Sequence, residues 1–117
     1  MAGTNRSFMK AILPIELVRK VDPSDSLNSS TILMLLYVMQ YPDSTVKELE
    51  LLTEIKRSAA SRHIQVLTER GDRARKRLGL GLVEYYEDAK DSRVKRVKLT
   101  AQGQRLANDI LKIMETY

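Results

Sequence analysis

The sequence contains no cysteine among its 117 residues and only one histidine. Without cysteine, neither a disulfide framework nor a thiolate metal site can form. Long apolar runs are missing too, since the longest block, residues 32–39, is far shorter than the roughly 18 residues of a membrane-spanning helix. The first residues do not follow a signal-peptide pattern, because Pro14 and several charges interrupt their apolar stretch. We therefore expect a cytoplasmic protein without membrane contact.

Catalytic signatures are equally scarce. His63 has no second histidine with which to share a metal, so we expect it to lie at the surface or half-buried. Glu48, Glu50 and Glu54 have the spacing of a solvated helix face rather than of a catalytic pair of carboxylates. No glycine-rich phosphate loop, nucleophile elbow or zinc signature occurs. The sequence thus predicts neither an enzyme nor a bound metal or cofactor.

Positive charge is the most informative feature of the composition. The chain carries 20 Lys and Arg against 15 Asp and Glu, a net charge of +5. Residues 56–98 hold 13 of the basic and 6 of the acidic residues, which is a net +7 and leaves −2 for the rest of the chain. A basic block of this kind indicates a polyanionic partner, although a solvated charged surface would have the same composition.

The whole chain has the length of a single domain. Two helices are predicted in its first third. The N-terminal helix lies within residues 1–22, with apolar residues at helical spacing, and Pro14 predicts a kink or a restart of the helix. Residues 31–41 are apolar nearly all round, which predicts the buried central helix of the domain. The residues that could cap this second helix are Ser26, Asn28 and Ser29.

A helix-turn-helix pattern occupies residues 45–71. Thr45 and Glu48 stand at capping-box spacing at the start of a short helix. A tight turn and a second helix follow, and Gly71 is expected to end that second helix. The apolar residues that share one face of it are Ala60, Ile64 and Leu67. Its other faces carry small, polar and basic side chains, as a DNA-recognition helix requires.

The hydrophobic period changes from 3.6 to 2 after residue 81. Residues 82–99 contain two β-rich runs joined by the loop 89–93, which predicts a hairpin with Val97 and Leu99 turned inward. Residues 100–117 return to a helical period, and their apolar face is broad enough to cover both a core and a partner. The predicted fold class is mainly α with a small β-hairpin, in the element order of a winged helix.

The residues of this pattern resemble the MarR family of winged-helix transcription regulators. The resemblance covers residues 45–106, and its most specific part is the string Asp-x-Arg…Leu-Thr-x-x-Gly between Asp91 and Gly103, within "DAKDSRVKRVKLTAQG". It implies a homodimer that is tied together by N- and C-terminal helices and binds pseudo-palindromic duplex DNA. It also implies that the recognition helix enters the major groove and that the wing reaches the minor groove or the backbone.

The resemblance assigns roles to individual residues, and side-chain chemistry agrees with them. Arg93 would be the wing arginine, positioned by Asp91, and a guanidinium at a hairpin tip fits a narrow minor groove. Arg62 can form a fork onto guanine and Gln65 suits adenine. Residues 58–61 could alternatively be a helix cap followed by small packing residues. The residues expected to contact DNA outside the insertion described next are Lys56, Arg57, Ser58, Ala59, Ser61, Arg62, Gln65, Arg93 and Lys95.

Ten residues, "DRARKRLGLG" at 72–81, separate the recognition helix from the wing. Without them the chain would read "ERGLVEYY", an ordinary junction of helix and strand, so their removal is expected to leave the fold intact. They form either a short extra turn that ends at Gly79 or an extension of the wing strand with alternating leucines, Leu78, Leu80 and Leu82. A solvated loop is the alternative to a DNA contact. The basic residues expected to grip flanking phosphates are Arg73, Arg75, Lys76 and Arg77.

The terminal helices predict a dimer, because they carry more apolar residues than one small domain can bury. The residues expected at this interface are Phe8, Ile12, Ile110, Met114 and Tyr117. The insertion is the largest departure from the family, and two further features depart from it. Glu50 stands where a small apolar residue is common, and the last helix ends at Tyr117 without a second long dimerisation helix. With only six aromatic residues as well, a pocket for a small-molecule effector is doubtful.

Two other functions remain open from the sequence. The first is a winged helix used as a protein-docking module in a transcription, replication or phage assembly. The basic recognition helix and wing favour DNA over this alternative. The second is binding of RNA or of single strands, which is disfavoured because no exposed aromatic platform is evident beyond Tyr85 and Tyr86.

Overall fold

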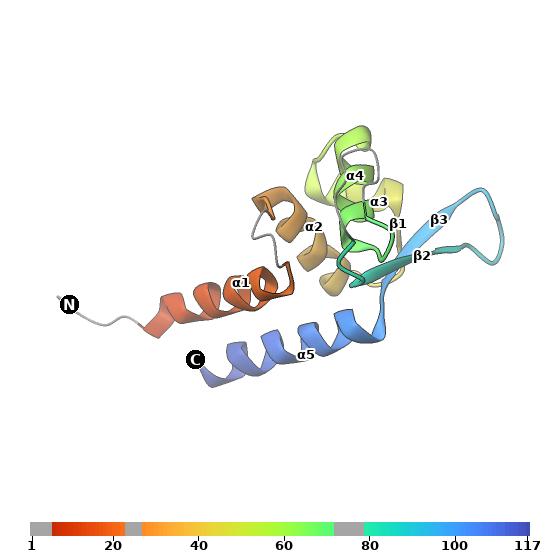
Figure 1. Ribbon diagram of the computed structural model, residues 1–117. Coiled ribbons are helices and arrows are strands. Elements are labelled where there is room, and N and C mark those ends of the chain that lie inside the picture. Colours follow the sequence, from red (N-terminus) through yellow and green to blue (C-terminus); the bar gives the residue numbers. More distant parts are fainter. Residues whose placement is uncertain (1–5, 23–26, 72–78) are drawn as a thin grey trace.

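The computed structural model describes residues 6–22, 27–71 and 79–117, and in these ranges it shows five α-helices and a small antiparallel sheet (Figure 1). The expected fold class, mainly α with a β-hairpin in winged-helix order, is confirmed. The elements in chain order are η1 (Arg6–Phe8), α1 (Met9–Val21), α2 (Ser29–Gln40), β1 (Ser44–Thr45), α3 (Val46–Thr53), α4 (Arg57–Leu67), β2 (Val83–Glu87), β3 (Lys95–Leu99) and α5 (Ala101–Thr116).

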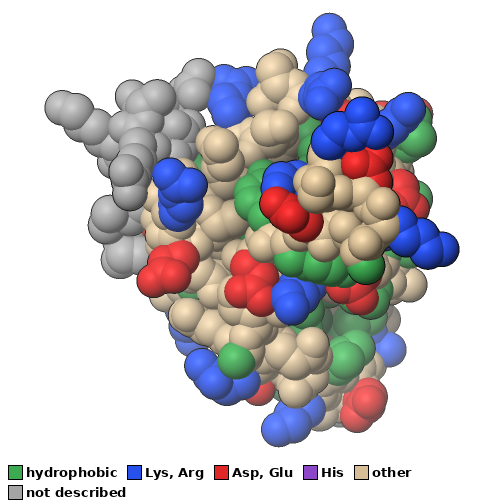
Figure 2. All heavy atoms as spheres, turned by 90° about the vertical axis from the view of Figure 1, so that its right-hand side faces the viewer, with side chains coloured by type: hydrophobic (Ala, Val, Ile, Leu, Met, Phe, Trp, Pro, Cys, Tyr) green, Lys and Arg blue, Asp and Glu red, His purple; other side chains and the backbone are tan. Residues whose placement is uncertain are grey.

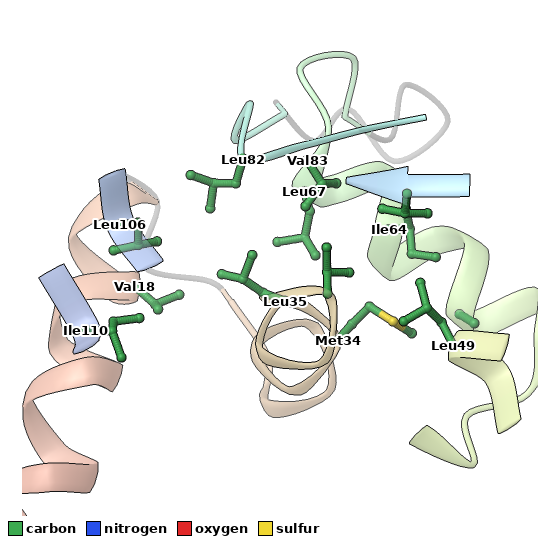
Figure 3. Close-up of a cluster of buried hydrophobic side chains, with 13 residues drawn as sticks. Val18, Met34, Leu35, Leu49, Ile64, Leu67, Leu82, Val83, Leu106 and Ile110 are labelled. Carbon is green, nitrogen blue, oxygen red and sulfur yellow. The ribbon is translucent and has the colours of Figure 1, made fainter. Parts of the chain in front are cut away.

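Helices α1 and α5 form an arm that projects from the rest of the molecule. They run side by side in opposite directions, so that the start of α1 and the end of α5 lie at the far end of the arm (Figure 1). Helix α1 is one continuous helix, with Pro14 buried inside it, so the expected restart at this proline does not occur. Val18 of α1 packs between Leu106 and Ile110 of α5, as Figure 3 shows, and all three are buried.

Helix α2 is the central helix that the sequence predicts. Met34, Leu35 and Val38 have no solvent exposure, and they connect the arm on one side to the helix-turn-helix on the other (Figure 3). Of the three predicted caps, Asn28 is the one used, because its Oδ1 accepts from the backbone amide of Thr31 at 2.9 Å. The cap satisfies one of the first amides of the helix, which otherwise have no partner.

The capping box that starts α3 is present as predicted. Thr45 Oγ1 accepts from the amide of Glu48 at 3.0 Å, and Glu48 Oε1 accepts from the amide of Thr45 at 2.9 Å. Leu49 is fully buried beneath the helix. Glu50 is half-buried, and within the described residues its Oε1 is buried without a hydrogen-bond partner. Replacing Glu50 with a small residue would therefore break no hydrogen bond made by Oε1.

Helix α4 buries the face that the sequence predicts. Ala60, Ile64 and Leu67 have no solvent exposure. The helix ends at Leu67, however, and not at Gly71, so the expected stop at the glycine is wrong. Thr68 ends it, because this residue is extended and its hydroxyl donates to Gln65 O at 2.6 Å. Gly71 instead has a φ of 67°, in a turn that lies beyond the helix.

The sheet contains a strand that the sequence analysis missed. Its order is β1-β3-β2, with all pairs antiparallel. The hairpin of β2 and β3 is the predicted one, and Val97 in β3 is fully buried while Leu99 is half-buried. The additional strand β1 is only two residues long and pairs Ser44 with Val97. Two residues show no alternation, so no period could reveal this strand.

The start of α5 explains the glycine of the Leu-Thr-x-x-Gly string. Thr100 caps the helix by accepting from the amide of Gly103 at 3.1 Å, while its hydroxyl donates to Gly81 O at 2.6 Å. A Cβ on Gly103 would lie 2.0 Å from the carbonyl oxygen of Leu82. The glycine therefore lets α5 approach the backbone just before β2.

The last residues of the insertion belong to the folded core. The amide of Leu80 donates to Val66 O at 3.0 Å and that of Leu82 to Leu67 O at 2.8 Å, while Leu80 also packs against the hydrophobic core. A Cβ on Gly79 would meet the carbonyl oxygen of Thr68 at 2.0 Å. Residues 79–82 thus pair with the end of α4 and do not extend β2. That all ten residues can be removed with the fold intact stays a prediction, and residues 79–81 are the part of the insertion that contacts the rest of the fold.

Candidate nucleic-acid interface

The outer face of α4 carries most of the residues that were expected to contact DNA. Ser58, Arg62 and Gln65 are exposed and Ser61 is half-buried, and their spacing places them on the side of the helix opposite its buried face. Lys56 and Arg57 are exposed at the N-terminus of α4. Within the described part of the chain, no ion pair engages Lys56, Arg57 or Arg62. Their charges are therefore accessible to an anionic partner.

A second flank of α4 is occupied by contacts within the chain. Ala59, another residue expected to contact DNA, is half-buried and lies on the flank of His63 rather than at the centre of the outer face. His63 Nδ1 lies 2.8 Å from the hydroxyl oxygen of Thr31, whose hydroxyl donates to Asn28 Oδ1 at 3.1 Å. The Thr31 hydroxyl therefore lies within hydrogen-bond distance of both Asn28 and His63. The histidine thus ties α4 to the start of α2.

The tip of the wing holds the predicted Asp91–Arg93 pair. Arg93 Nε and Nη2 donate to the two carboxylate oxygens of Asp91 at 3.1 and 3.3 Å, and the amide of Arg93 donates to Oδ1 at 3.1 Å. The Arg93 side chain is 89% exposed. Its side-chain hydrogen bond, followed by that of its amide, lowers the pKa of Asp91 below the ordinary value. The carboxylate thus stays charged at neutral pH, and the guanidinium that it binds remains exposed to solvent.

The two lysines of β3 are paired with acids. Lys95 Nζ lies 3.1 Å from Glu87 Oε1, and Lys98 Nζ lies 3.5 Å from Glu84 Oε1. Lys98 also lies over the ring of Tyr86, 5.1 Å from its centroid. Lys95, expected to contact DNA, is exposed but has this acidic neighbour. The wing therefore presents neutralised pairs along its strands, with Arg93 at its tip.

The predicted basic block is weaker in the described part of the chain than in the whole sequence. Residues 56–71 and 79–98 contain 9 of the 13 basic residues of this block and 5 of its 6 acidic residues, a net +4 instead of +7. Figure 2 shows basic side chains around the edge of the wing face, with acidic side chains between them. The remaining basic residues of the block, Arg73, Arg75, Lys76 and Arg77, lie outside the described residues, as does Leu78.

The apolar residues expected at a dimer interface separate into two groups. Phe8, Ile12, Met114 and Tyr117 have 45 to 65% of their surface exposed on the arm. Ile110 is only 5% exposed, because it faces Val18 within the same chain (Figure 3). It belongs to the core of the arm and not to its outer surface. The sequence analysis missed the exposed Ile15 and Leu111, at 44 and 55%.

One group of contacts that the sequence analysis missed centres on Arg96 of β3. Its side chain reaches Asp88 in the hairpin and Asp43 before β1. The sequence analysis counted Arg96 only as positive charge. No local signal could have found this role, because Arg96 and Asp43 are 53 positions apart.

Neither a metal centre nor a membrane span is found in the described ranges. No cluster of three or more His, Asp or Glu side chains there has the arrangement of metal ligands. None of the helices in those ranges is long and apolar enough to cross a membrane. A hollow of about 1050 Å³ opens between the end of α4, β2 and the start of α5. It adjoins Gly71 and Gly79, the two described residues that flank residues 72–78.

Comparison with known proteins identifies the fold. No family model matches the chain, and no curated protein matches it. Solved structures do match over 90 to 94% of the chain. A MarR transcriptional regulator from Methanosarcina mazei Go1 is 24% identical with a TM-score of 0.63, and 94% of this chain covers 71% of that one. A transcriptional regulator from Thermotoga maritima is 15% identical with a TM-score of 0.67, and 94% of this chain covers 68% of that one.

A third similar structure is a MarR variant from E. coli in complex with operator DNA, with 18% identity, a TM-score of 0.59, and coverage of 90% of this chain and 68% of that chain. Across the neighbours compared, this chain spans 62 to 74% of their lengths. The chain thus has the winged-helix fold of MarR-type structures.

Proposed function

We propose that this protein is a transcription regulator, not an enzyme, that binds specific duplex DNA as a homodimer. In this proposal the outer face of α4 enters the major groove, while Arg93 at the wing tip reaches the minor groove. The fold that the chain shares with MarR-type regulators supports this function, as do the operator-DNA complex of the E. coli MarR variant and a DNA complex of MepR from S. aureus, which has the same fold.

The observation that carries the proposal is the contrast between acid-paired and unpaired basic residues. The basic residues of the wing strands are paired with acids, and Arg93 at the wing tip is paired with Asp91, whereas the basic residues at the start of α4 are unpaired within the described chain. Arg57 and Arg62 therefore lie free of acids on a helix face with the small side chains Ser58 and Ser61. Small side chains let a helix backbone approach a groove, and the free guanidinium groups can bind phosphate or guanine.

The arm of α1 and α5 is the proposed dimer interface. Its exposed apolar residues lie on a two-helix unit that projects from the DNA-binding part of the molecule (Figure 1). A two-fold axis through such arms would place two α4 helices on successive turns of one face of the duplex, about 10 base pairs apart. The residues proposed at this interface are Phe8, Ile12, Ile15, Leu111, Met114 and Tyr117.

The four basic residues of the insertion are proposed to bind additional phosphates. Gly71 and Gly79, which flank residues 72–78, lie between the end of α4 and the start of β2, two elements of the proposed interface. Three of the four basic residues are arginines, which bind phosphate oxygens with a two-pronged fork. Replacing all four with glutamine keeps the chain length and the contacts that residues 79–81 make with the end of α4.

Selection from a library of random duplex DNA, followed by titration at several salt concentrations, tests the function. We expect an enriched site with two related half-sites, and an affinity that falls steeply with salt because bound phosphates release counterions. The glutamine variant of the insertion is expected to lower the slope of log K against log salt by about 0.9 for each phosphate that the variant no longer binds.

Failure to enrich any sequence, together with a salt-independent affinity for DNA, would contradict the proposal. The protein-docking alternative draws support from the acid-paired wing, which has little net charge to attract DNA. Under that alternative, random duplex DNA would bind weakly even at low salt. Preference for a single strand over the duplex would instead favour the single-strand alternative.

A further inference from the structure

One arginine connects the wing to the helix-turn-helix. Arg96 in β3 donates from Nε to Asp88 Oδ1 at 2.6 Å and from Nη1 to the carbonyl oxygen of Asp43 at 2.8 Å. Its Nη1 also lies 3.9 Å from Glu48 Oε1. A single guanidinium therefore contacts the hairpin, the turn before β1 and the first turn of α3.

A tyrosine on the same face of the hairpin adds a second link. Tyr86 in β2 lies directly across from Arg96 in the sheet, and its hydroxyl donates to Asp43 Oδ1 at 2.5 Å. The amide of Asp43 donates in turn to Val97 O at 3.1 Å. Asp43 has a φ of 66°, in the left-handed region that aspartate tolerates better than most residues. Asp43 thus makes three hydrogen bonds to the hairpin.

The geometry of the sheet makes these links necessary. Strand β1 pairs only with Val97 and Arg96, so the part of the hairpin beyond them has no third strand beside it. That part projects from the body of the molecule (Figure 1). A two-stranded hairpin has little stability of its own in water. Side-chain contacts where this part begins, at Arg96, can therefore help to fix its direction.

We propose that Arg96 is a positioning residue that sets the wing relative to α4, so that Arg93 and the recognition helix can engage DNA together. For the DNA contact this rests on the function proposed above. Arg96 itself is not expected to touch DNA, because its side chain is only 33% exposed and already has three oxygen partners. Its pairing with Asp88 also leaves no net charge at this point.

The test begins with hydrogen exchange of the free protein. Arg96→Met keeps the aliphatic part of the side chain and removes the guanidinium, whereas Arg96→Lys keeps the charge but cannot bridge the same partners. Both are expected to speed exchange at the amide of Asp43 by about tenfold or more. Lys98→Met is the matched control, because Lys98 shares this face but contacts only Glu84 and Tyr86 within the hairpin.

The second measurement is DNA affinity with and without the wing arginine. Both Arg96 variants are expected to weaken binding about tenfold in the natural background and less than about twofold when Arg93→Ala has already removed the wing contact. Lys98→Met should have a smaller effect in the natural background. If Arg96→Met does not fold, Tyr86→Phe removes the parallel link to Asp43 and is expected to show the same pattern with smaller changes.

Two results would overturn the inference. Unchanged exchange at Asp43 in every Arg96 variant would show that the arginine does not hold the wing. Reductions in affinity that add fully to that of Arg93→Ala would show that Arg96 contacts DNA directly. If the natural protein binds no duplex DNA, the proposed function fails, while the exchange experiment still decides whether Arg96 fixes the wing.

Discussion

Asp91 holds the guanidinium of Arg93 at the wing tip through two side-chain hydrogen bonds, of 3.1 and 3.3 Å. The two residues belong to one loop, so the pair needs no other element to form. A third bond, from the amide of Arg93, closes the turn on the same carboxylate. The Asp-x-Arg string therefore does two things at once: it ends the hairpin and it aims an exposed positive charge outward.

This pair gives the first prediction. Arg93→Ala should weaken duplex binding and lower the salt slope by about 0.9, the effect of removing one ionic interaction with a phosphate. The reduction in affinity should be larger on A·T-rich flanks, whose narrow minor groove attracts arginine. Lys90→Ala is the control, since it removes one exposed charge from the same hairpin end. Equal reductions for the two variants on all sequences would argue against a groove contact by Arg93.

Base readout by α4 can be separated from phosphate binding. Arg62→Ala is expected to weaken binding to the selected site by about 1–3 kcal/mol and to change binding to random DNA much less, because it removes a base contact. Arg57→Ala, at the first turn of the same helix, should weaken binding to the selected site and to random DNA alike. It should also lower the slope of log K against log salt by about 0.9. Titrations of both variants with the selected site and with random DNA test this. An equal reduction in affinity for the two DNAs in Arg62→Ala would show that Arg62 does not contact a base.

The arm predicts a dimer that one charge can disrupt. Ile12 is 45% exposed on α1, and Ile12→Asp would place a carboxylate in the proposed apolar interface, where a charge without a partner is costly. We expect sedimentation to show a dimer for the natural protein at micromolar concentration and a monomer for the variant. Lys10→Asp changes charge on an exposed residue of the same helix and should leave the dimer intact. A natural protein that is monomeric both free and on DNA would exclude this interface.

Replacing Gly103 with alanine is expected to destabilise the fold, whereas this replacement in a helix usually stabilises it. Glycine to alanine inside a helix ordinarily stabilises by up to about 1 kcal/mol. At Gly103 the new Cβ would lie 2.0 Å from the carbonyl oxygen of Leu82, so α5 must move away from the strand. We expect Gly103→Ala to lower the free energy of unfolding by about 1–3 kcal/mol in urea titrations. Lys112→Ala, on an exposed turn of α5, should change it by less than about 0.5 kcal/mol.

Glu48 is expected to contribute to the loss of stability of the fold at low pH. The backbone amide of Thr45, followed by its hydroxyl, lowers the pKa of Glu48 below its ordinary value of 4.5. A carboxyl whose pKa is lower in the folded state contributes stability above its unfolded pKa, and this contribution is lost as the pH falls through the folded pKa. Glu48→Gln keeps an acceptor for the amide of Thr45 but does not titrate.

The variant should therefore lose less free energy of unfolding than the natural protein between pH 7 and pH 3, as measured by urea titrations at several pH values. Asp88 and Asp91 also have lowered pKa values, so some acid sensitivity should remain in both proteins. An identical pH dependence for the two proteins would show that the capping carboxylate does not contribute.

Elements whose causes lie within a few neighbouring residues follow from the amino-acid sequence alone. The cap by Asn28, the capping box of Thr45 and Glu48, and the cap by Thr100 each depend on residues three positions apart. Such motifs form wherever the chain starts a helix, and the change of period from 3.6 to 2 marked the hairpin for the same reason. The pair of Asp91 and Arg93 was expected from the resemblance to the MarR family, and it forms within one loop.

The tertiary structure decided everything that joins distant parts of the chain. Arg96 reaches Asp43 across 53 positions, β1 exists only because β3 lies beside it, and Ile110 is buried only because α1 covers it. The pairing of residues 79–82 with α4 is of the same kind, since the amides of Leu80 and Leu82 donate to the carbonyl oxygens of Val66 and Leu67. A local pattern shows that a residue is apolar or charged. Its contact partner depends on how the elements pack, and the spacing of neighbouring residues carries no information about that packing.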